Sequence, residues 1–489
     1  MQESVAVGVT GPVALWAFLA YLGVMVGIGL LTSRFSSQGV GEFFVGGRRV
    51  NRVVVALSAV VSGRSAWLLL GVTGMAWSQG ASAIWAVAGY TVVELILFLT
   101  LAPRLRAFAE VHDCVTLPDI FAARFGDENG RLRLVLSGAL LLFMVGYVAA
   151  QFTAGGKAME ASFGLDAQMG VLITAAIVLG YTVMGGFLAV SITDSIQAVF
   201  MLFGLVAVPL VAATAVGGWG QVMTELAAID PTLVDPGALT FGAFLGLAGI
   251  GLGSPGNPHI IVRYLSIDDE KSLRFAGGVA TFWNVVMGVG AVAIGLVGRV
   301  LVPEVSGLPA ADTESLYPFL AQQYLPPVLF GIVVASIFAA IMSTADSQLL
   351  VGASAIVRDI YQKVLHRGEV VAQARLVALS RWSVAGLVVA SLAMGWVAQD
   401  VVFWLVLFAW AGLGAALGPV TLLSMYWKGM TRGGVFAGVF TGAAVTVVWY
   451  FTPALKSRLY ELIPAFSLSL LAAIVVSLIE NRSTSGGRQ

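Results

Sequence analysis

Long apolar stretches follow one another along almost the whole chain, and short polar segments separate them. A transmembrane helix needs about 20 apolar residues, and about thirteen stretches reach that length. They lie near residues 12–31, 53–77, 81–102, 134–161, 168–186, 189–216, 237–262, 276–302, 327–357, 377–398, 401–427, 433–451 and 462–479. The pattern predicts an all-α integral membrane protein with about thirteen transmembrane helices.

The second apolar stretch is interrupted in its middle by Gly63 and Arg64. A charge at that depth costs roughly 3 kcal/mol or more and marks a candidate functional residue. The alternative is that Arg64 reaches a water-filled vestibule or extends its charged end toward the membrane surface. We expect the helix to break at Gly63.

The seventh apolar stretch is interrupted by Gly253, Pro255, Gly256 and Pro258. Two prolines so close together are incompatible with a regular helix, so a break is predicted there too. The glycines have a simpler explanation, since small residues allow helices to pack closely. A pair of broken helices in two halves of a membrane protein points to a transporter binding site.

Spans two to six and seven to eleven form two sets of five, and each set begins with an interrupted stretch. An odd number of spans makes the two sets inverted relative to one another. We therefore expect an extra helix and cytoplasmic loop in residues 1–50, the first repeat in 51–217, the second repeat in 236–428, and two further helices with a short tail in 429–489.

Composition supports a membrane protein, because 58% of the residues are hydrophobic, only 11% are charged and the mean hydropathy is +0.93. A soluble domain carries about 25% charged residues. The net charge of zero gives no indication of nucleic-acid binding. No nucleophile and base pair, phosphate loop or metal-ligand spacing is evident, so we do not expect an enzyme.

The basic residues are distributed unevenly between alternate loops, 21 on one side, Arg263 among them, against 4 on the other. The positive-inside rule then places the N-terminus outside and the C-terminus in the cytoplasm, in a plasma membrane such as the bacterial inner membrane. The acidic loops near 217–236 and 303–316 are expected to be solvated rather than to attract ions.

Several motifs together carry a family resemblance. They are Ala56-Leu57-Ser58-Ala59, Thr116-Leu117-Pro118-Asp119, the stretch from Gly185 to Asp194, Asn257-Pro258-His259, the stretch from Ala339 to Leu350, and Ala409-Trp410-Ala411-Gly412. In these motifs the chain resembles the sodium/solute symporter family, most closely its sodium/proline symporters, from about Gly41 to about residue 478.

The resemblance implies a LeuT-type fold of five plus five helices, with one helix before the core and two after it, that carries a small solute inward with sodium. It also implies a sodium site. The implied ligands are the carbonyl oxygens of Val61, Arg64 and Ala340 and the side chains of Ser343 and Thr344. Hard cations prefer such oxygen ligands.

The chain departs from the family at this site. The sodium/proline symporters have an aspartate where Gly63 stands and an apolar residue where Arg64 stands, so the local charge differs by two units. One interpretation is that the Arg64 guanidinium replaces the ion and pairs with Ser343, Thr344 or Asp346. A proton on Asp194 or Asp346 would then be the coupling ion. Sodium coupling, proton coupling and uncoupled exchange all remain expectations, and no organic cofactor is expected.

Substrate contacts are expected around both breaks, from Ser65, Trp67, Ser254 and Asn257. Tyr147 matches a tyrosine linked to substrate in the proline carriers, although an aromatic residue in a membrane helix is more often a packing residue. Ile250 and Ser254 stand where those carriers have a tryptophan and a tyrosine, which removes two aromatic walls.

The sequence thus predicts a secondary active transporter of a small solute, such as proline, another amino acid or a small carboxylate. The alternative is a membrane sensor or receptor that keeps the fold without ion coupling. A sensor would need a cytoplasmic signalling domain, whereas only residues 480–489 follow the last span. The sequence does not indicate an oligomeric state.

Overall fold

The computed structural model describes residues 12–36, 38–367, 369–397 and 402–486. Residues 1–11 and 487–489, which hold the two termini whose orientation is predicted above, lie outside the described residues. The described residues are helical almost throughout, and their one recorded β-bridge joins Val50 to Ile267. An all-helical membrane fold is therefore confirmed.

Ten helical segments of the described chain are long and apolar enough to cross a membrane. Two of them, Arg52–Val111 with 60 residues and Ala167–Val216 with 50 residues, have the length of two crossings each. Gly80 (φ 66°) turns the first of these segments and Gly186 (φ 58°) turns the second. Positive φ angles are readily adopted by glycine.

The helices follow the order that the hydrophobic pattern predicts. The first part of the chain forms α1 (Pro12–Ser36), α2 (Val40–Val45), α3 (Arg52–Ala66), α4 (Thr73–Gln79), α5 (Ile84–Val111), α6 (Leu117–Phe125), α7 (Arg131–Phe163) and α8 (Ala167–Val216). The middle part forms α9 (Trp219–Ile229), α10 (Phe241–Ala248), α11 (Pro258–Ser266), α12 (Leu273–Leu301), α13 (Leu316–Tyr324), α14 (Pro327–Ser354), α15 (Gln373–Val397) and α16 (Val402–Tyr426). The last part forms α17 (Arg432–Tyr450), α18 (Pro453–Lys456) and α19 (Leu462–Gly486).

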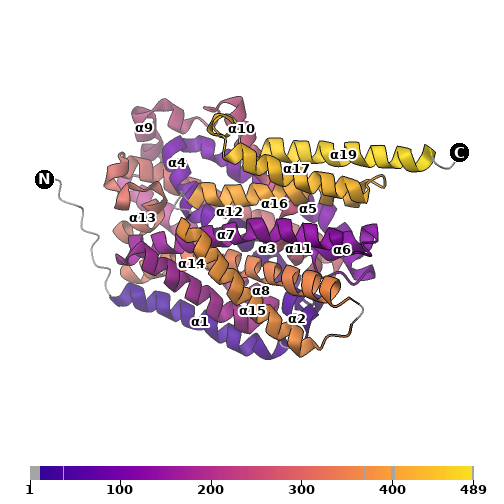
Figure 1. Cartoon of the computed structure of the whole chain (residues 1–489). Helices are drawn as coiled ribbons and strands as arrows, with labels where there is room; N and C mark the ends of the chain where they lie inside the picture. Colours follow the sequence, from indigo (N-terminus) through magenta and orange to yellow (C-terminus); the bar gives the residue numbers. More distant parts are fainter. Residues whose placement is uncertain (1–11, 37, 368, 398–401, 487–489) are drawn as a thin grey trace.

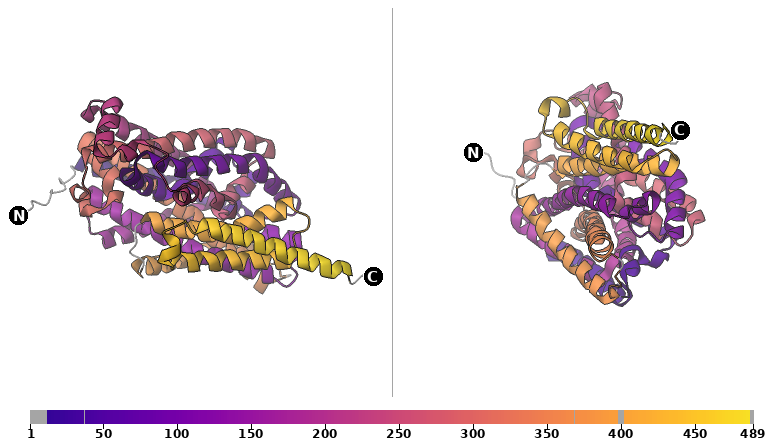
Figure 2. Two further views of the ribbon diagram at one scale, coloured as in Figure 1. Left: turned by 90° about the horizontal axis from the view of Figure 1, so that it is seen from above. Right: turned by 45° about the vertical axis from the view of Figure 1, so that its right-hand side comes forward.

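Helices α14 and α16 form the centre of the bundle. In each of them 83% of the apolar window is buried, against 28% in α1. Helix α14 packs against α1, α3, α7 and α8, and α16 packs against α7 and α17. Figures 1 and 2 show α17 and α19 side by side along one flank, with α9, α10 and α13 at one end of the bundle and α2 and α6 at the other (Figure 1).

The first broken helix turns at Ser65, two residues after the predicted break at Gly63. Ser65 has φ 51° and ψ −174°, and a π-helical segment, Trp67–Val72, follows it. Gly63 is instead required by packing, because a Cβ atom there would lie 2.1 Å from the Tyr90 hydroxyl. The glycine leaves room for the Tyr90 side chain of α5 against α3, and the non-helical residue is Ser65, so the prediction that Gly63 breaks the helix is wrong.

The second break is confirmed. Helix α10 ends at Ala248, a 3₁₀ segment covers Gly249–Gly256, and α11 begins at Pro258 after the extended residue Asn257. The glycines are also packing residues, as the simpler explanation stated. A Cβ atom on Gly253 would lie 2.0 Å from Trp410 Nε1.

The acidic loop near 303–316 is not fully solvated. Glu314 is only 2% exposed and pairs with Lys157 at 2.6 Å. Its carboxylate also accepts hydrogen bonds from the backbone N–H groups of Val402 and Phe403, at 3.1 Å and 2.8 Å. The expectation of a solvated loop is wrong for Glu314, because this residue joins the loop to the start of α16.

Candidate functional site

A cluster of buried oxygen atoms lies between α3 and α14, next to the first break. The Ser343 hydroxyl donates to the carbonyl oxygens of Val61, at 3.3 Å, and Ala340, at 3.2 Å. The Thr344 hydroxyl donates to the Ser62 carbonyl oxygen at 3.0 Å. The structure thus brings together four of the five predicted sodium ligands, and the fifth, the Arg64 carbonyl, accepts from Trp67 N–H at the turn.

The turn at Ser65 is held by specific hydrogen bonds. A non-glycine residue at positive φ costs on the order of 1–3 kcal/mol and persists where surrounding contacts fix it. Ser65 Oγ accepts from Trp67 N–H at 3.1 Å, and Gln151 Oε1 accepts from Ala66 N–H at 3.1 Å. Gln151, a buried polar residue of α7, was not among the predicted site residues.

The Arg64 side chain is fully buried and points toward α5 and α12. Its Nε donates to Asn284 Oδ1 at 2.6 Å, and its Nη2 donates to Thr91 Oγ1 at 3.0 Å. Its guanidinium carbon lies 4.0 Å from the centre of the Tyr90 ring. These contacts hold Nε, Nη2 and one face of the guanidinium, whereas Nη1 is buried without a hydrogen-bond partner among the described residues.

The predicted pairing of Arg64 with Ser343, Thr344 or Asp346 is therefore wrong. The hydroxyls of Ser343 and Thr344 are already bonded to backbone carbonyls, and the Arg64 side chain leaves the opposite side of α3. The sequence reasoning missed Glu94, a buried acid one turn beyond Tyr90 that interacts electrostatically with Arg64. An acidic residue within a predicted span was the signal that would have found it.

A second polar cluster joins α3, α8, α11 and α14. Asp194 Oδ2 accepts from Ser58 Oγ at 2.5 Å, from Ser62 Oγ at 3.3 Å and from Arg263 Nη2 at 3.1 Å. Arg263 also donates to Ser62 Oγ at 2.8 Å and to the Ser347 hydroxyl. Asp194 therefore makes a buried ion pair and does not serve as a helix cap.

The sequence analysis assigned Arg263 to a cytoplasmic loop, and this assignment is wrong. Arg263 is only 1% exposed and lies in α11. The sequence placed it just beyond a predicted span, and the helical segment that follows the break in fact continues to Ser266 inside the protein. An arginine so deeply buried requires an anionic partner, and Asp194 provides it.

Asp346 belongs to the same cluster. Its carboxylate accepts from the Tyr181 hydroxyl and, at 3.0 Å, from Ser347 Oγ. The Ser347 and Ser62 hydroxyls are 3.2 Å apart. Two buried carboxylates, Asp194 and Asp346, thus lie in one cluster with a single buried guanidinium.

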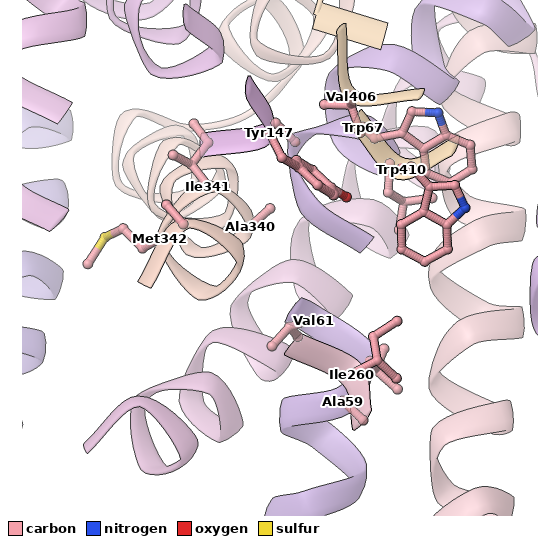
Figure 3. Close-up of a cluster of buried hydrophobic side chains, with 14 of the residues drawn as sticks. Ala59, Val61, Trp67, Tyr147, Ile260, Ala340, Ile341, Met342, Val406 and Trp410 are labelled. Carbon is pink, nitrogen blue, oxygen red and sulfur yellow. The ribbon is translucent and has the colours of Figure 1, made fainter. Parts of the chain in front are cut away.

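The predicted substrate residues lie around the two breaks. Tyr147 is buried, interacts with Ser65 and makes an edge contact with His259 at 5.9 Å between ring centres. Figure 3 shows the Tyr147 ring directed toward the side on which Trp67 and Trp410 lie. The aromatic residues therefore gather next to the oxygen cluster.

Hydrogen bonds join the second break to α16 and also connect two residues within the break. Trp410 Nε1 donates to the Ile250 carbonyl oxygen at 2.8 Å, and Asn257 Nδ2 donates to the Gly253 carbonyl oxygen at 2.8 Å. The Ser254 hydroxyl is buried without a hydrogen-bond partner among the described residues. Asn257 Oδ1 also lacks a partner in the described chain, so Ser254 and Asn257 each leave one polar atom free for a ligand.

A family model described as the sodium:solute symporter family matches residues 43–442. Sodium/proline symporters of Staphylococcus aureus, for example from strains JH9 and NCTC 8325 / PS 47, are 38% identical to the chain over 473 residues. The match covers 94% of this chain and 92% of each relative.

The fold matches solved transporter structures. A substrate-bound, outward-open Na+-coupled sialic acid symporter superposes with a TM-score of 0.81 at 19% identity, over 96% of this chain and 98% of that chain. Mhp1, a nucleobase-cation-symport-1 family transporter in a closed conformation, superposes with a TM-score of 0.56 at 14% identity, over 91% and 95%. The expected LeuT-type fold is confirmed, and the chain belongs to the sodium:solute symporter family of membrane transporters.

Proposed function

We propose that this protein is a sodium-coupled importer of a small amino-acid-like solute, with proline as the first candidate, in a plasma membrane such as the bacterial inner membrane. The observation that carries the proposal is the buried oxygen cluster of Val61, Ala340, Ser343 and Thr344 between a broken helix and α14. The name of the sodium/proline relatives supports the choice of ion and solute.

The position of Arg64 supports sodium over the replacement of sodium by arginine. A like charge about 4 Å from a cation would cost roughly 4 kcal/mol at an effective dielectric constant near 20. The guanidinium instead binds Asn284 and Thr91 on the far side of α3 and interacts with Glu94. In this proposal the buried acid Glu94, within electrostatic range of Arg64, takes the place of the aspartate that is missing at Gly63.

The solute site that we propose lies between the two breaks, with Ser65, Trp67, Tyr147, Ile250, Ser254 and Asn257 around it. Broken helices offer free amide and carbonyl groups to a zwitterion. Ile250 and Ser254 provide less aromatic surface than a tryptophan and a tyrosine, so we expect weaker selection for a pyrrolidine ring than in the proline carriers.

The coupling mechanism that we propose is alternating access, in which the repeat in 51–217 moves against the repeat in 236–428. Sodium between Val61 and Ser343 would hold α3 to α14. The cluster of Asp194, Arg263 and Asp346 joins four helices near this site. Because it has one carboxylate more than it has guanidinium groups, a proton on Asp346 is the second candidate for the coupling ion.

The test is uptake by the purified protein in proteoliposomes, with a sodium gradient, a proton gradient or no gradient, over a panel of amino acids and short carboxylates. We expect uptake to follow the sodium gradient. Thr344→Val removes one oxygen ligand, and we expect the sodium concentration for half-maximal uptake to rise about tenfold or more. Ser354→Ala, on the same helix but away from the cluster, should leave it unchanged.

Uptake that is driven equally well by protons in the absence of sodium would assign the coupling to Asp194 or Asp346 instead. Solute binding without uptake under every gradient would support the sensor alternative.

A further inference from the structure

A basic groove lies beside the ends of α5 and α16 and next to α6. It has a volume of about 550 Å³, and its lining includes Arg104, Phe108, Arg124, Tyr426, Trp427 and Lys428. None of the described residues that line it is acidic. The groove therefore combines three cationic side chains with aromatic ones.

The cations of the groove have no acidic partners among the described residues, unlike Arg133, Arg358 and Arg432 on the same predicted face, which pair with aspartates. Arg104 donates to the Met425 carbonyl oxygen at 3.2 Å and lies 4.2 Å from the centre of the Tyr426 ring. Arg124 Nε is buried and has no hydrogen-bond partner in the described chain. The three cations of the groove thus lack an anionic partner among the described residues, and an anion in the groove would provide one.

The groove lies at a membrane boundary. The predicted spans end near residues 102 and 427, so Arg104 and Lys428 follow the two ends by one or two residues. Tyr426 and Trp427 are of the kind that gathers at membrane–water interfaces. On α5, Val92, Ile96 and Leu99 are 57%, 52% and 44% exposed. Their spacing of four and three residues places them on one face of the helix that also carries Arg104.

We propose that the basic groove binds the phosphodiester headgroup of an anionic phospholipid, whose acyl chain lies along the exposed apolar face of α5. Arg124 and Lys428 bind the phosphate oxygens, and Tyr426 and Trp427 lie at headgroup level. The apolar face favours a lipid over soluble phosphate, because a free inorganic anion gains nothing from contact with an apolar surface. Cytoplasmic basic pockets between membrane helices suit anionic headgroups.

The test measures phospholipid binding to the full-length protein in a neutral detergent, by native mass spectrometry, with phosphatidylglycerol and phosphatidylcholine of matched chains. We expect phosphatidylglycerol to bind more tightly. Arg124→Gln with Lys428→Gln should lower its affinity about tenfold or more, since each charge contributes a factor of about five. Arg104 stays in place because it also holds the end of α16.

The matched control is Arg274→Gln with Arg367→Gln, which removes two exposed charges on the same predicted face but outside the groove. This pair should leave the affinity within about twofold. Should the groove pair fail to fold, Lys428→Gln alone, at an exposed residue, should still lower the affinity about fivefold.

Three results would overturn the proposal. Equal losses in the groove pair and the control pair would mean that phosphatidylglycerol follows the diffuse positive charge of the face. Equal affinity for phosphatidylcholine would mean that the headgroup charge is not recognised. If inorganic phosphate displaced phosphatidylglycerol and bound as well as the lipid does, the groove would be a site for a soluble anion.

Discussion

Arg64 shows how one residue can be both out of place in a family pattern and well accommodated in the fold. Its guanidinium has hydrogen-bond partners on α5 and α12, and Glu94 on α5 is a buried acid within electrostatic range of it. Gly63 is part of the same arrangement, since only a glycine lets Tyr90 approach α3 so closely. The pair Gly63 and Arg64 therefore forms one structural unit with Tyr90 and Glu94.

A double-mutant cycle tests this unit. Arg64→Met leaves Glu94 as a buried charge without its cationic neighbour, and we expect a loss of about 3–5 kcal/mol in the free energy of unfolding. Arg64→Met with Glu94→Gln should recover at least about 1 kcal/mol relative to the sum of the single changes. Titration with a denaturing detergent measures all four forms, and strictly additive losses would contradict the coupling.

Glu461, just before α19, makes stability depend on pH. It is 1% exposed, and burial raises its pKa to about 7. The folded protein then holds a proton that the unfolded chain releases near pH 4.5, so stability falls as pH rises from about 4.5 to about 7 and is constant above.

We therefore expect Glu461→Gln to unfold at a higher temperature than the unchanged protein at pH 8 and at nearly the same temperature at pH 4.5. A shift from 4.5 to about 7 corresponds to roughly 3 kcal/mol. Melting curves at several pH values provide the measurement. If the melting temperatures of the two proteins differed by the same amount at pH 4.5 and at pH 8, the pKa of Glu461 would not be raised in the folded protein.

At the scale of elements, the 3₁₀ segment Gly249–Gly256 depends on its close contact with α16. Gly253→Ala would bring a methyl group within 2.0 Å of Trp410 Nε1, the donor to the Ile250 carbonyl oxygen. We expect a destabilisation of about 1–3 kcal/mol from overpacking, together with loss of solute uptake. Melting temperature and uptake are the measurements.

The matched control for this contact is Gly278→Ala in α12, where a Cβ atom would meet nothing within 4 Å. This change should be neutral or slightly stabilising, because alanine is the better helix former. If the control loses as much stability as Gly253→Ala, the close approach to Trp410 is not the cause.

The motif Thr116-Leu117-Pro118-Asp119 has a structural role at the start of α6. Thr116 Oγ1 accepts from Asp119 N–H at 3.0 Å and caps α6, and Asp119 Oδ2 accepts from Val115 N–H at 3.1 Å. Asp119 also pairs with Arg133 at 2.5 Å and with Arg358 at 3.3 Å. The motif thus starts a helix and anchors it to α7 and to the helical segment that follows α14.

At the scale of the whole molecule, the start of α1 and the end of α19 lie at opposite ends of the bundle (Figure 1). The side of the membrane that each end faces is a prediction from the distribution of basic residues. Cysteine labelling tests it well, because the one native cysteine, Cys114, is buried and can be replaced by serine.

In a Cys114→Ser background we expect Ser457→Cys, an exposed position between α18 and α19, to react with a membrane-impermeant maleimide in intact cells. Arg367→Cys, an exposed position before α15, should react only after permeabilisation. The reason is the positive-inside rule, which places the basic loop with Arg367 in the cytoplasm. The opposite labelling pattern would reverse the predicted orientation.

The sequence by itself determined the helical membrane fold and the second break, and the family resemblance that it carries implied four residues of the oxygen cluster. Apolar stretches of about 20 residues leave the backbone no other way to satisfy its hydrogen bonds in a bilayer. Pro255 and Pro258 prevent a continuous helix locally, so no knowledge of neighbouring helices was needed.

Only the tertiary structure decided where the buried charges find partners. Arg64 and Glu94 are 30 positions apart, and Asp194 and Arg263 are 69 apart, so spacing along one helix gives no information about either pair. Arg263 pairs with Asp194, and Arg64 contacts Asn284 and Thr91, since a buried charge without partners is costly. Which partners each one finds depends on how α3, α5, α8, α11 and α12 pack, and the same packing turned Arg64 away from the oxygen cluster.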